Sequence, residues 1–197
     1  MSKRDNPDDE RARITGEGLQ GQDEDFRVIR RILEGETEEY RQLVERYQGQ
    51  IYSLILHMLH DSEQARDLTQ ETFVKAWEAL PSFRQGHRFF SWIYRIALNL
   101  AINRARKRYR TVSLSGAMQV QGEDHQENRD DAAHIEMAIA QLKADHRVVI
   151  ILKYYQGMSY EEIAEAIGIS TKRVRSRLFE ARVRLKDILE RSGYYEH

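Results

Sequence analysis

Two clusters of Lys and Arg stand out in this sequence, because their composition and spacing indicate that they bind a partner of opposite charge. Residues 79–122 contain eight Lys or Arg and no Asp or Glu, and residues 172–186 contain seven Lys or Arg and one acid, Glu180. The formal net charge of the whole chain is nevertheless −1, because the acids lie elsewhere. A basic run on one helix is usually only a solvated face, but two clusters on a near-neutral chain indicate binding of a polyanion.

The first cluster lies within FFSWIYRIALNLAINRARKRYR, residues 89–110, which is apolar at its start and basic at its end. The spacing predicts a helical stripe that faces the core in the first half of this stretch, at Phe89, Ile93, Ile96, Ala97 and Leu100. Trp92 is also expected in the core. Arg95, Asn99 and Asn103 follow one another at four-residue intervals on another side. Asn can hydrogen-bond exposed base edges, and unpaired bases can stack on aromatic side chains near the preceding loop, namely Phe83, Phe89, Phe90 and Tyr94. The pattern predicts a helix anchored at one end that holds single-stranded nucleic acid at the other.

The second cluster lies within MSYEEIAEAIGISTKRVRSRLFEARVRLKDIL, residues 158–189. Ser159 and Glu162 have the spacing of a capping box, and Gly168 can end this short helix in a left-handed conformation. Ser170 or Thr171 can cap the next helix, whose apolar stripe is Val174, Leu178, Ala181, Leu185 and Ile188. This spacing is typical of a helix-turn-helix, whose second helix enters the major groove by its N-terminal end. The alternative, an ordinary helical hairpin, is disfavoured by the basic second helix.

The elements that position these clusters follow helical periodicity throughout. The 3–4 spacing of apolar residues predicts helices from Phe26, from Tyr40 to Met58 and from DSEQ at 61–64 to Leu80, where Pro81 stops the helix. Further helices are predicted around Ile135–Leu142 and from a cap at Asp145. Neither a β-hairpin signal nor an internal repeat is present in the sequence. We therefore predict an all-α protein of two small helical domains joined by a flexible linker.

The domain boundaries follow from where periodicity starts and stops. Residues 1–24 are polar and charged and are predicted to be a disordered extension. A first domain is expected at 25–110, a linker without periodicity at 111–131, and the helix-turn-helix domain at 132–192. A linker of this length permits many placements of one domain relative to the other, so the sequence leaves this placement open.

Several classes of protein are excluded by the composition. The chain has no cysteine, which rules out disulfides and thiolate metal sites. No secretory signal is present at the N-terminus, and the longest apolar run, residues 148–155, is too short to span a bilayer, so we expect a cytoplasmic protein. His57 and His60 lie one turn apart, but no HExxH pattern supports a metal pair. With no nucleophile elbow or phosphate-binding glycine loop, we expect no enzyme, no cofactor and no metal.

Three stretches, read in order, resemble a known family: DLTQETFVKAWEALPSF, FFSWIYRIALNLAINRARK and MSYEEIAEAIGIS…VRSRLFEARVRL. They resemble bacterial RNA polymerase sigma factors of the extracytoplasmic-function (ECF) group, over about residues 25–190. The resemblance implies a sigma-2 domain at 25–110, which docks on core polymerase and melts the −10 element, and a sigma-4 domain at 132–192, which reads the −35 element. It also implies that the linker passes through the polymerase active-site cleft.

The resemblance also implies three sets of site residues. Contacts with core polymerase are expected at Asp67, Gln70 and Glu71, a segment that would otherwise be read as a plain amphipathic helix. Binding of the melted −10 strand is expected at Arg84, Arg88, Phe90, Arg95, Asn99, Asn103, Arg104, Arg106 and Lys107. Recognition of the −35 duplex is expected at Thr171, Lys172, Arg173, Arg175, Ser176, Phe179 and Arg182.

The partners implied are core RNA polymerase, promoter DNA as −35 duplex and −10 single strand, and an anti-sigma factor, with no direct membrane insertion. Glu180 and the STKRV stretch at 170–174 depart from the common pattern of the family, so the −35 preference cannot be transferred from relatives. Three other functions are considered. The first is an ordinary helix-turn-helix regulator that acts without polymerase, which leaves the aromatic and basic residues 83–110 unexplained. The second is an enzyme, for which His57 and His60 offer only an unsupported metal pair. The third is an interaction adaptor, which the arginine-rich helices disfavour.

Overall fold

The structure, a computed structural model, describes residues 23–84, 87–115 and 128–192, and the side chains of residues 23–84, 87–106 and 132–192. Every regular element in this part of the chain is helical, which confirms the all-α prediction. The elements are a helix over residues 23–33, the 3-10 turn η1 (Thr37–Glu39), α2 (Tyr40–Leu59), α3 (Ser62–Ala79), the 3-10 turn η2 (Leu80–Ser82), α4 (Phe89–Ser115), α5 (Asn128–Gln141), α6 (Ala144–Ile150), the π-helical turn η3 (Ile151–Tyr155), α7 (Tyr160–Ile167) and α8 (Thr171–Arg191).

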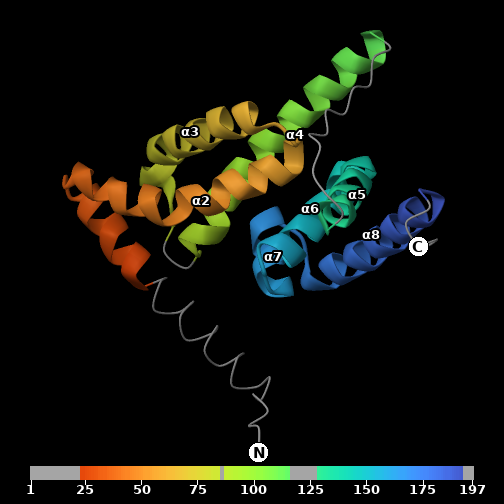
Figure 1. Cartoon of the computed structure of the whole chain (residues 1–197). Coiled ribbons are helices and arrows are strands. Elements are labelled where there is room, and N and C mark those ends of the chain that lie inside the picture. Colours follow the sequence, from red (N-terminus) through yellow and green to blue (C-terminus); the bar gives the residue numbers. More distant parts are fainter. Residues whose placement is uncertain (1–22, 85–86, 116–127, 193–197) are drawn as a thin grey trace, which may run out of the picture.

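The N-terminal elements form one packed group in which α2, α3 and α4 contact one another (Figure 1). The apolar stripes predicted for these helices supply its centre, where Leu54, Ile55, Ile93 and Ala97 are fully buried. Asp61 caps α3, accepting a 2.9 Å hydrogen bond from the Gln64 backbone N–H. Capping and periodicity therefore position α4 against α2 and α3 by one face only.

The C-terminal group consists of α5 to α8, and its turns are those that the sequence predicts. Ser159 and Glu162 form a reciprocal capping box at the start of α7, and Gly168 ends α7 with φ +70°. Ser170 caps α8 through the backbone N–H of Arg173. The helix-turn-helix is thus held by a cap at each start and by the one left-handed residue between its helices.

Some boundaries differ from the sequence-based expectation. α4 continues to Ser115 and α5 begins at Asn128, so both helices extend into the segment 111–131 that was predicted as a linker. Residues 116–127 of that segment, and residues 1–22 of the predicted extension, lie outside the described residues. Lys143, rather than Asp145, is the N-cap residue of α6, and Asp145 lies in its first turn. Periodicity locates helices well but does not fix the turn at which each one starts.

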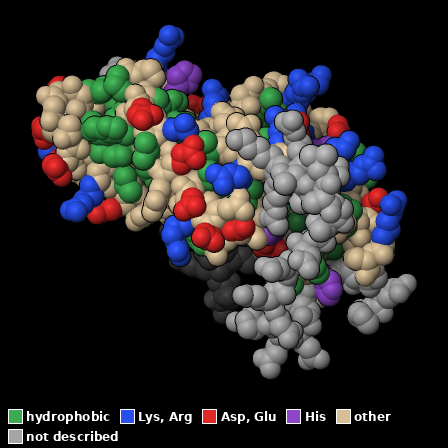
Figure 2. Space-filling view, turned by 90° about the horizontal axis from the view of Figure 1, so that it is seen from above, with side chains coloured by type: hydrophobic (Ala, Val, Ile, Leu, Met, Phe, Trp, Pro, Cys, Tyr) green, Lys and Arg blue, Asp and Glu red, His purple; other side chains and the backbone are tan. Residues whose placement is uncertain are grey.

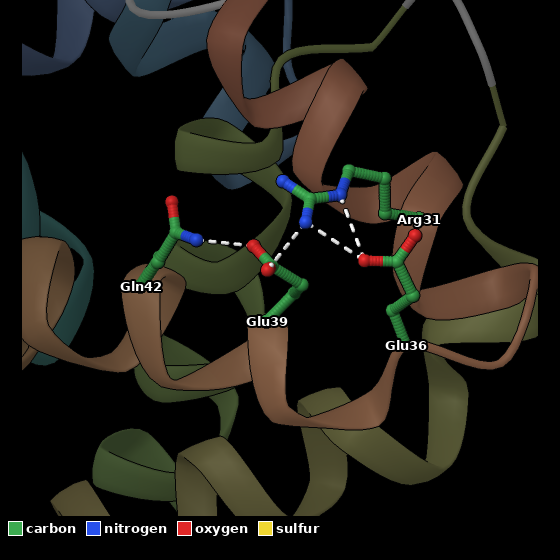
Figure 3. Close-up of polar contacts among 4 residues, drawn as sticks. All are labelled: Arg31, Glu36, Glu39 and Gln42. Atoms are coloured by element: carbon green, nitrogen blue, oxygen red, sulfur yellow. Dashed lines mark hydrogen bonds and ion pairs between the residues drawn. The ribbon is translucent and has the colours of Figure 1, made fainter.

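Arg31 holds the turn between the helix over residues 23–33 and α2 (Figure 3). Its guanidinium lies 2.7 Å from Glu36 Oε2 and 2.7 Å from Glu39 Oε1, and the Gln42 side-chain amide donates to Glu39 as well. Gly35 makes the reversal with φ +112°. Because Arg31 and Glu36 are about half exposed, these ion pairs specify the direction of the turn more than they stabilise the fold.

A buried carboxylate fixes the helix over residues 23–33 to α2. Asp25, which is 3% exposed, accepts hydrogen bonds from the Arg46 guanidinium and the Tyr47 hydroxyl. Burial raises the pKa of Asp25, while the bonds from Tyr47 and Arg46 oppose that change. The folded state therefore holds this proton more tightly than the unfolded chain, and ionisation of Asp25 at neutral pH opposes folding to that extent.

The two groups of helices pack directly on each other, a placement that the sequence left open. α7 contacts α4, and η3 and α5 contact α2, so that buried residues of both groups belong to one apolar cluster. Arg147 of α6 also reaches across and donates a 2.9 Å hydrogen bond to the Met58 carbonyl near the end of α2. Burial lowers the pKa of Arg147, and its acceptors are all backbone carbonyls, of Met58, Ala140 and Leu142.

Replacing Asp25 with Ala should lower the free energy of unfolding by about 3 kcal/mol, because it leaves Arg46 and Tyr47 without their shared acceptor. Asp25→Asn keeps an acceptor and removes the buried charge, so we expect a loss of only about 1 kcal/mol. Urea unfolding of both variants at neutral pH measures the difference. Equal losses for the two variants would show that the charge, not the hydrogen bonds, holds this helix.

Candidate nucleic-acid and polymerase interfaces

The N-terminal half of α8 presents the predicted −35 residues on one open surface. Val174 and Leu178 are buried and fix the rotation of the helix. The exposed side chains of this surface are Lys172, Arg173, Arg175, Ser176, Phe179 and Arg182. Phe179 is 66% exposed. Thr171, at the start of the helix, is half-buried. The helix-turn-helix geometry therefore brings all seven predicted residues to one stretch of helix.

Neighbouring groups orient the polar side chains of this surface. The Arg175 guanidinium lies 5.7 Å from the centroid of the Tyr160 ring, and Arg182 Nε donates a 2.8 Å hydrogen bond to the Tyr154 hydroxyl. Ser176 donates to Glu180 Oε1 at 3.2 Å, so Glu180 holds a hydroxyl of the surface as well as placing a negative charge beside it. The sequence analysis missed both tyrosines, because each reaches α8 from another element.

The predicted −10 residues lie on α4 and in the loop before it, in two different states. The exposed ones include Arg84, Asn99, Asn103 and Arg106. Arg104 is half-buried. Arg88 is half-buried and Arg95 is exposed, and both are bonded to α7. The Lys107 side chain lies outside the described residues.

The aromatic residues predicted to stack on bases are only partly available. Phe89 and Tyr94 are 1% exposed, and the Tyr94 hydroxyl donates a 2.8 Å hydrogen bond to Gln156 Oε1 of the C-terminal group. Phe83 and Phe90 remain half-buried, with Phe90 packed 4.3 Å from Tyr94 between ring centroids. In this arrangement stacking on Phe89 or Tyr94 is wrong, because both rings belong to the apolar core, while Phe83 and Phe90 still present an edge.

The contact between α4 and α7 uses the charges of both helices. Arg88 Nη1 lies 2.7 Å from Glu162 Oε1, and the Ser91 hydroxyl donates to Glu165 Oε2 at 2.9 Å. Arg95 Nη2 donates to the Glu165 carbonyl at 2.5 Å, near the end of α7. Arg88, the residue before α4, and two polar residues of α4 thus face the acidic side and the carbonyl end of one short helix.

The residues predicted to contact polymerase form an outward stripe on α3. Asp67 and Gln70 are exposed, and Glu71 is half-buried with Lys75 Nζ 3.7 Å from its carboxylate. The same stripe continues into two large apolar side chains, Val74 at 56% and Trp77 at 39% exposure. The sequence analysis missed Val74 and Trp77. Both are apolar residues at outward positions of an otherwise polar helix face, and this pattern could have indicated a binding surface.

Exposed hydrophobic side chains gather on this half of the molecule, as Figure 2 shows, among separate acidic and basic side chains. The Trp77 ring lies 5.0 Å from that of Tyr40 in an edge-on arrangement, so it is held in place while part of it faces solvent. An apolar centre with an acidic border is the composition of a protein-binding surface. Asp67, Gln70, Glu71, Val74 and Trp77 are called the α3 stripe below.

His57 and His60, one turn apart on α2, both contact Glu136 of α5. The distances are 3.4 Å from His57 Nε2 and 3.3 Å from His60 Nδ1 to the two carboxylate oxygens. The hydrogen bond from His60 lowers the pKa of Glu136. Within the described residues these histidines therefore connect the two groups of helices, and no cluster there is suited to hold a metal ion. None of the described helices combines the length and apolar character needed to cross a membrane.

A helical protein with an exposed basic helix-turn-helix is a DNA-binding protein, and comparison with known proteins makes its class specific. Residues 43–111 match sigma-70 region 2, and residues 133–185 match sigma-70 region 4. The chain is 33% identical over 184 residues to the RNA polymerase sigma-H factor of Pseudomonas aeruginosa, covering 86% of this chain and 95% of that protein. It is 32% identical to the ECF sigma factor SigW of Bacillus subtilis, covering 73% and 85%.

Two solved structures have the same fold. One is the sigma factor RpoE in complex with the anti-sigma factor NepR from Bartonella quintana, with a TM-score of 0.64 and 28% identity over 78% of this chain and 98% of that one. The other is CnrH in complex with the cytosolic domain of CnrY, with a TM-score of 0.64 and 28% identity over 83% and 95%. The chain belongs to the ECF group of the sigma-70 family. It is a transcription initiation factor that directs RNA polymerase to promoters, not an enzyme.

Arg175→Ala should weaken binding of a −35 duplex by about 1–3 kcal/mol, because it removes an exposed guanidinium from the stretch of α8 that is predicted to read the duplex. Fluorescence anisotropy with a labelled duplex at fixed salt measures the change. Arg184→Ala, which removes the same charge from another exposed position on α8, is the matched control and should change affinity little. Equal losses from both variants would reduce Arg175 to a general electrostatic role.

The double variant Asp67→Ala and Glu71→Ala should weaken binding to core polymerase roughly tenfold, because it removes the charges of the α3 stripe. Val74→Ser should weaken binding by a similar factor, because it removes part of the apolar centre of the stripe. Competition against wild type for immobilised core enzyme provides the measurement. Glu63→Ala, another exposed acid of α3, is the control. Unchanged affinity in all variants would remove α3 from the polymerase interface.

Proposed function

We propose that the chain divides promoter recognition between two surfaces, with α8 reading the −35 duplex and α4 holding the melted −10 strand. The observation that carries this proposal is the presence of two basic surfaces of different chemistry on one chain. The surface on α8 is a single exposed helix end of the size that enters a major groove. The surface on α4 combines amide and guanidinium groups with the edges of Phe83 and Phe90, as a single-strand site requires.

On α8, phosphate contacts and base contacts have different sources. Lys172 and Arg173 lie in the first turn, where they and the free backbone N–H groups of the helix N-terminus can meet phosphates. Arg175 and Ser176 lie further along the groove-facing side and can reach base edges. Glu180, bonded to Ser176, places an acceptor beside them that suits the amino group of cytosine and repels phosphate.

On α4, the exposed amides of Asn99 and Asn103 can hydrogen-bond bases that have left the duplex, and Arg104 and Arg106 can neutralise the strand. Lys107, next in sequence, extends the basic run. A site that binds only unstacked bases lowers the free energy of the melted state and not that of the duplex, which favours opening. No covalent bond changes on this protein, and the chemistry of RNA synthesis belongs to polymerase.

The partners proposed for the chain are core polymerase, through the α3 stripe, promoter DNA, and an anti-sigma factor. The complexes of RpoE with NepR and of CnrH with CnrY support the third partner, since both are structures of similar proteins bound to such a factor. We place the protein in the cytoplasm, where its promoters and polymerase lie. The function requires no cofactor.

Reconstituted transcription tests this function. Purified chain, bacterial core RNA polymerase and a pool of genomic promoter fragments should give specific run-off transcripts that are absent without the chain, and alignment of their starts should reveal a −35 and a −10 element. Omission of either component is the control. No transcripts, together with tight and salt-sensitive duplex binding by the chain alone, would instead identify an ordinary helix-turn-helix regulator.

A further inference from the structure

Glu180 lies at the border between the DNA-facing surface of α8 and the neighbouring helix α6, and both of its carboxylate oxygens have a partner. Oε1 accepts a 3.2 Å hydrogen bond from the Ser176 hydroxyl, one turn earlier on α8. Oε2 lies 3.5 Å from Nε2 of His146, which belongs to α6. The carboxylate is therefore held from two sides, although the side chain of Glu180 is 59% exposed.

His146 has a fixed position from which to hold this carboxylate. Its side chain is only 18% exposed, and residues 148–150 of the same helix are buried. The residue before it, Asp145, lies 3.4 Å from the guanidinium of Arg177 on α8. Two adjacent residues of α6 thus contact α8, and of these two it is His146 that contacts a side chain bonded to the DNA-facing surface.

A carboxylate at this place distinguishes one base from the others only when its direction is fixed. It accepts and does not donate, so in the major groove it suits the amino group of cytosine; guanine and thymine present acceptors there, and the amino group of adenine adjoins the N7 acceptor. A free side chain divides its population among three staggered wells about each sp³ torsion. Affinity for the base falls with the fraction of molecules that hold the competent rotamer. A contact that fixes Glu180 therefore raises discrimination at that base pair.

We propose that His146 is a positioning residue for −35 recognition, which holds the Glu180 carboxylate beside Ser176 so that it accepts from cytosine at one position of the −35 element. This inference rests on the proposed −35 function of α8. His146 touches no base and acts through Glu180. Sequence preference at that position then depends on α6, a helix outside the helix-turn-helix.

Discrimination between base pairs measures this role. The probes are labelled duplexes that carry the −35 element mapped by run-off transcription, with each base pair replaced in turn, and fluorescence anisotropy gives the ratio of affinities at every position. Glu180→Ala identifies the base that Glu180 reads, as the cytosine at which this ratio falls to about one. We expect the wild type to prefer cytosine there roughly tenfold and His146→Ala to prefer it only about threefold.

Three further variants separate positioning from packing. His146→Gln keeps a side-chain N–H that can donate to the carboxylate, so it should restore the wild-type preference. Asp145→Ala removes the neighbouring contact between α6 and α8 and should leave the preference unchanged. His146→Ala added to Glu180→Ala should cause no additional loss, because His146 acts only through the carboxylate.

Other outcomes would overturn the proposal in distinguishable ways. Full cytosine preference in His146→Ala, or equal losses in this variant, His146→Gln and Asp145→Ala, would remove the positioning role and leave the proposed function standing. Preference unaltered at every position by Glu180→Ala would also overturn the proposal, because Glu180 would then read no base. The proposed −35 function of α8 would itself be wrong if Arg175→Ala also left the affinity for the duplex unchanged.

The contact between α6 and α8 can also be observed without DNA. In NMR spectra of the imidazole rings, the His146 signals are those that are absent from His146→Gln. Glu180→Gln should move these signals, whereas Glu190→Gln, which removes the same charge from another exposed position of α8, should not. His146 signals that are the same in Glu180→Gln and in the wild type would contradict the proposal.

Discussion

The rotational setting of α4 is the constraint on which both the fold and the −10 surface depend. Phe89, Ile93 and Ala97 are buried against α2 and α3, and a helix turns about 100° per residue. Once these three side chains are packed, the helix geometry places Arg95, Asn99 and Asn103 on another side of α4, away from the core. A single rotation by one residue would bury a guanidinium and expose a phenyl ring. Packing in the first group of helices therefore fixes the side of α4 on which the proposed −10 residues lie.

Several guanidinium groups of the described residues have oxygen acceptors within the protein. Arg147 bonds to three carbonyls, Arg182 to a tyrosine hydroxyl, and Arg88 and Arg95 to α7. Other guanidinium groups, such as those of Arg84 and Arg106, are exposed, and water can satisfy their donors. Exchange of one set of oxygen acceptors for another requires little net free energy. The proposed −10 function of α4 is therefore compatible with the contact that α4 makes with α7.

Local signals in the sequence predicted most of the fold and the exposure of the proposed −35 residues on α8, and the misses have physical causes. The capping box at Ser159 and Glu162, the turn at Gly168 and the stripe of Val174 and Leu178 involve residues close in sequence, whose spacing is visible without a structure. The burial of Tyr94 depends on Gln156, sixty-two residues away in the other group of helices. Tyr160 lies in the same group as Arg175 but on α7, so the spacing within α8 does not show this contact. Contacts between the two groups of helices leave no periodic trace, so the sequence could not place one group on the other.

Glu162 divides its two carboxylate oxygens between two tasks. Oε2 accepts from the Ser159 backbone N–H and closes the capping box, while Oε1 pairs with Arg88 of α4. Loss of the Arg88 pair therefore leaves the start of α7 fully capped. A substitution of Glu162 consequently has two effects, one on the local start of a helix and one on the contact between the two groups of helices, whereas a substitution of Arg88 affects the second alone.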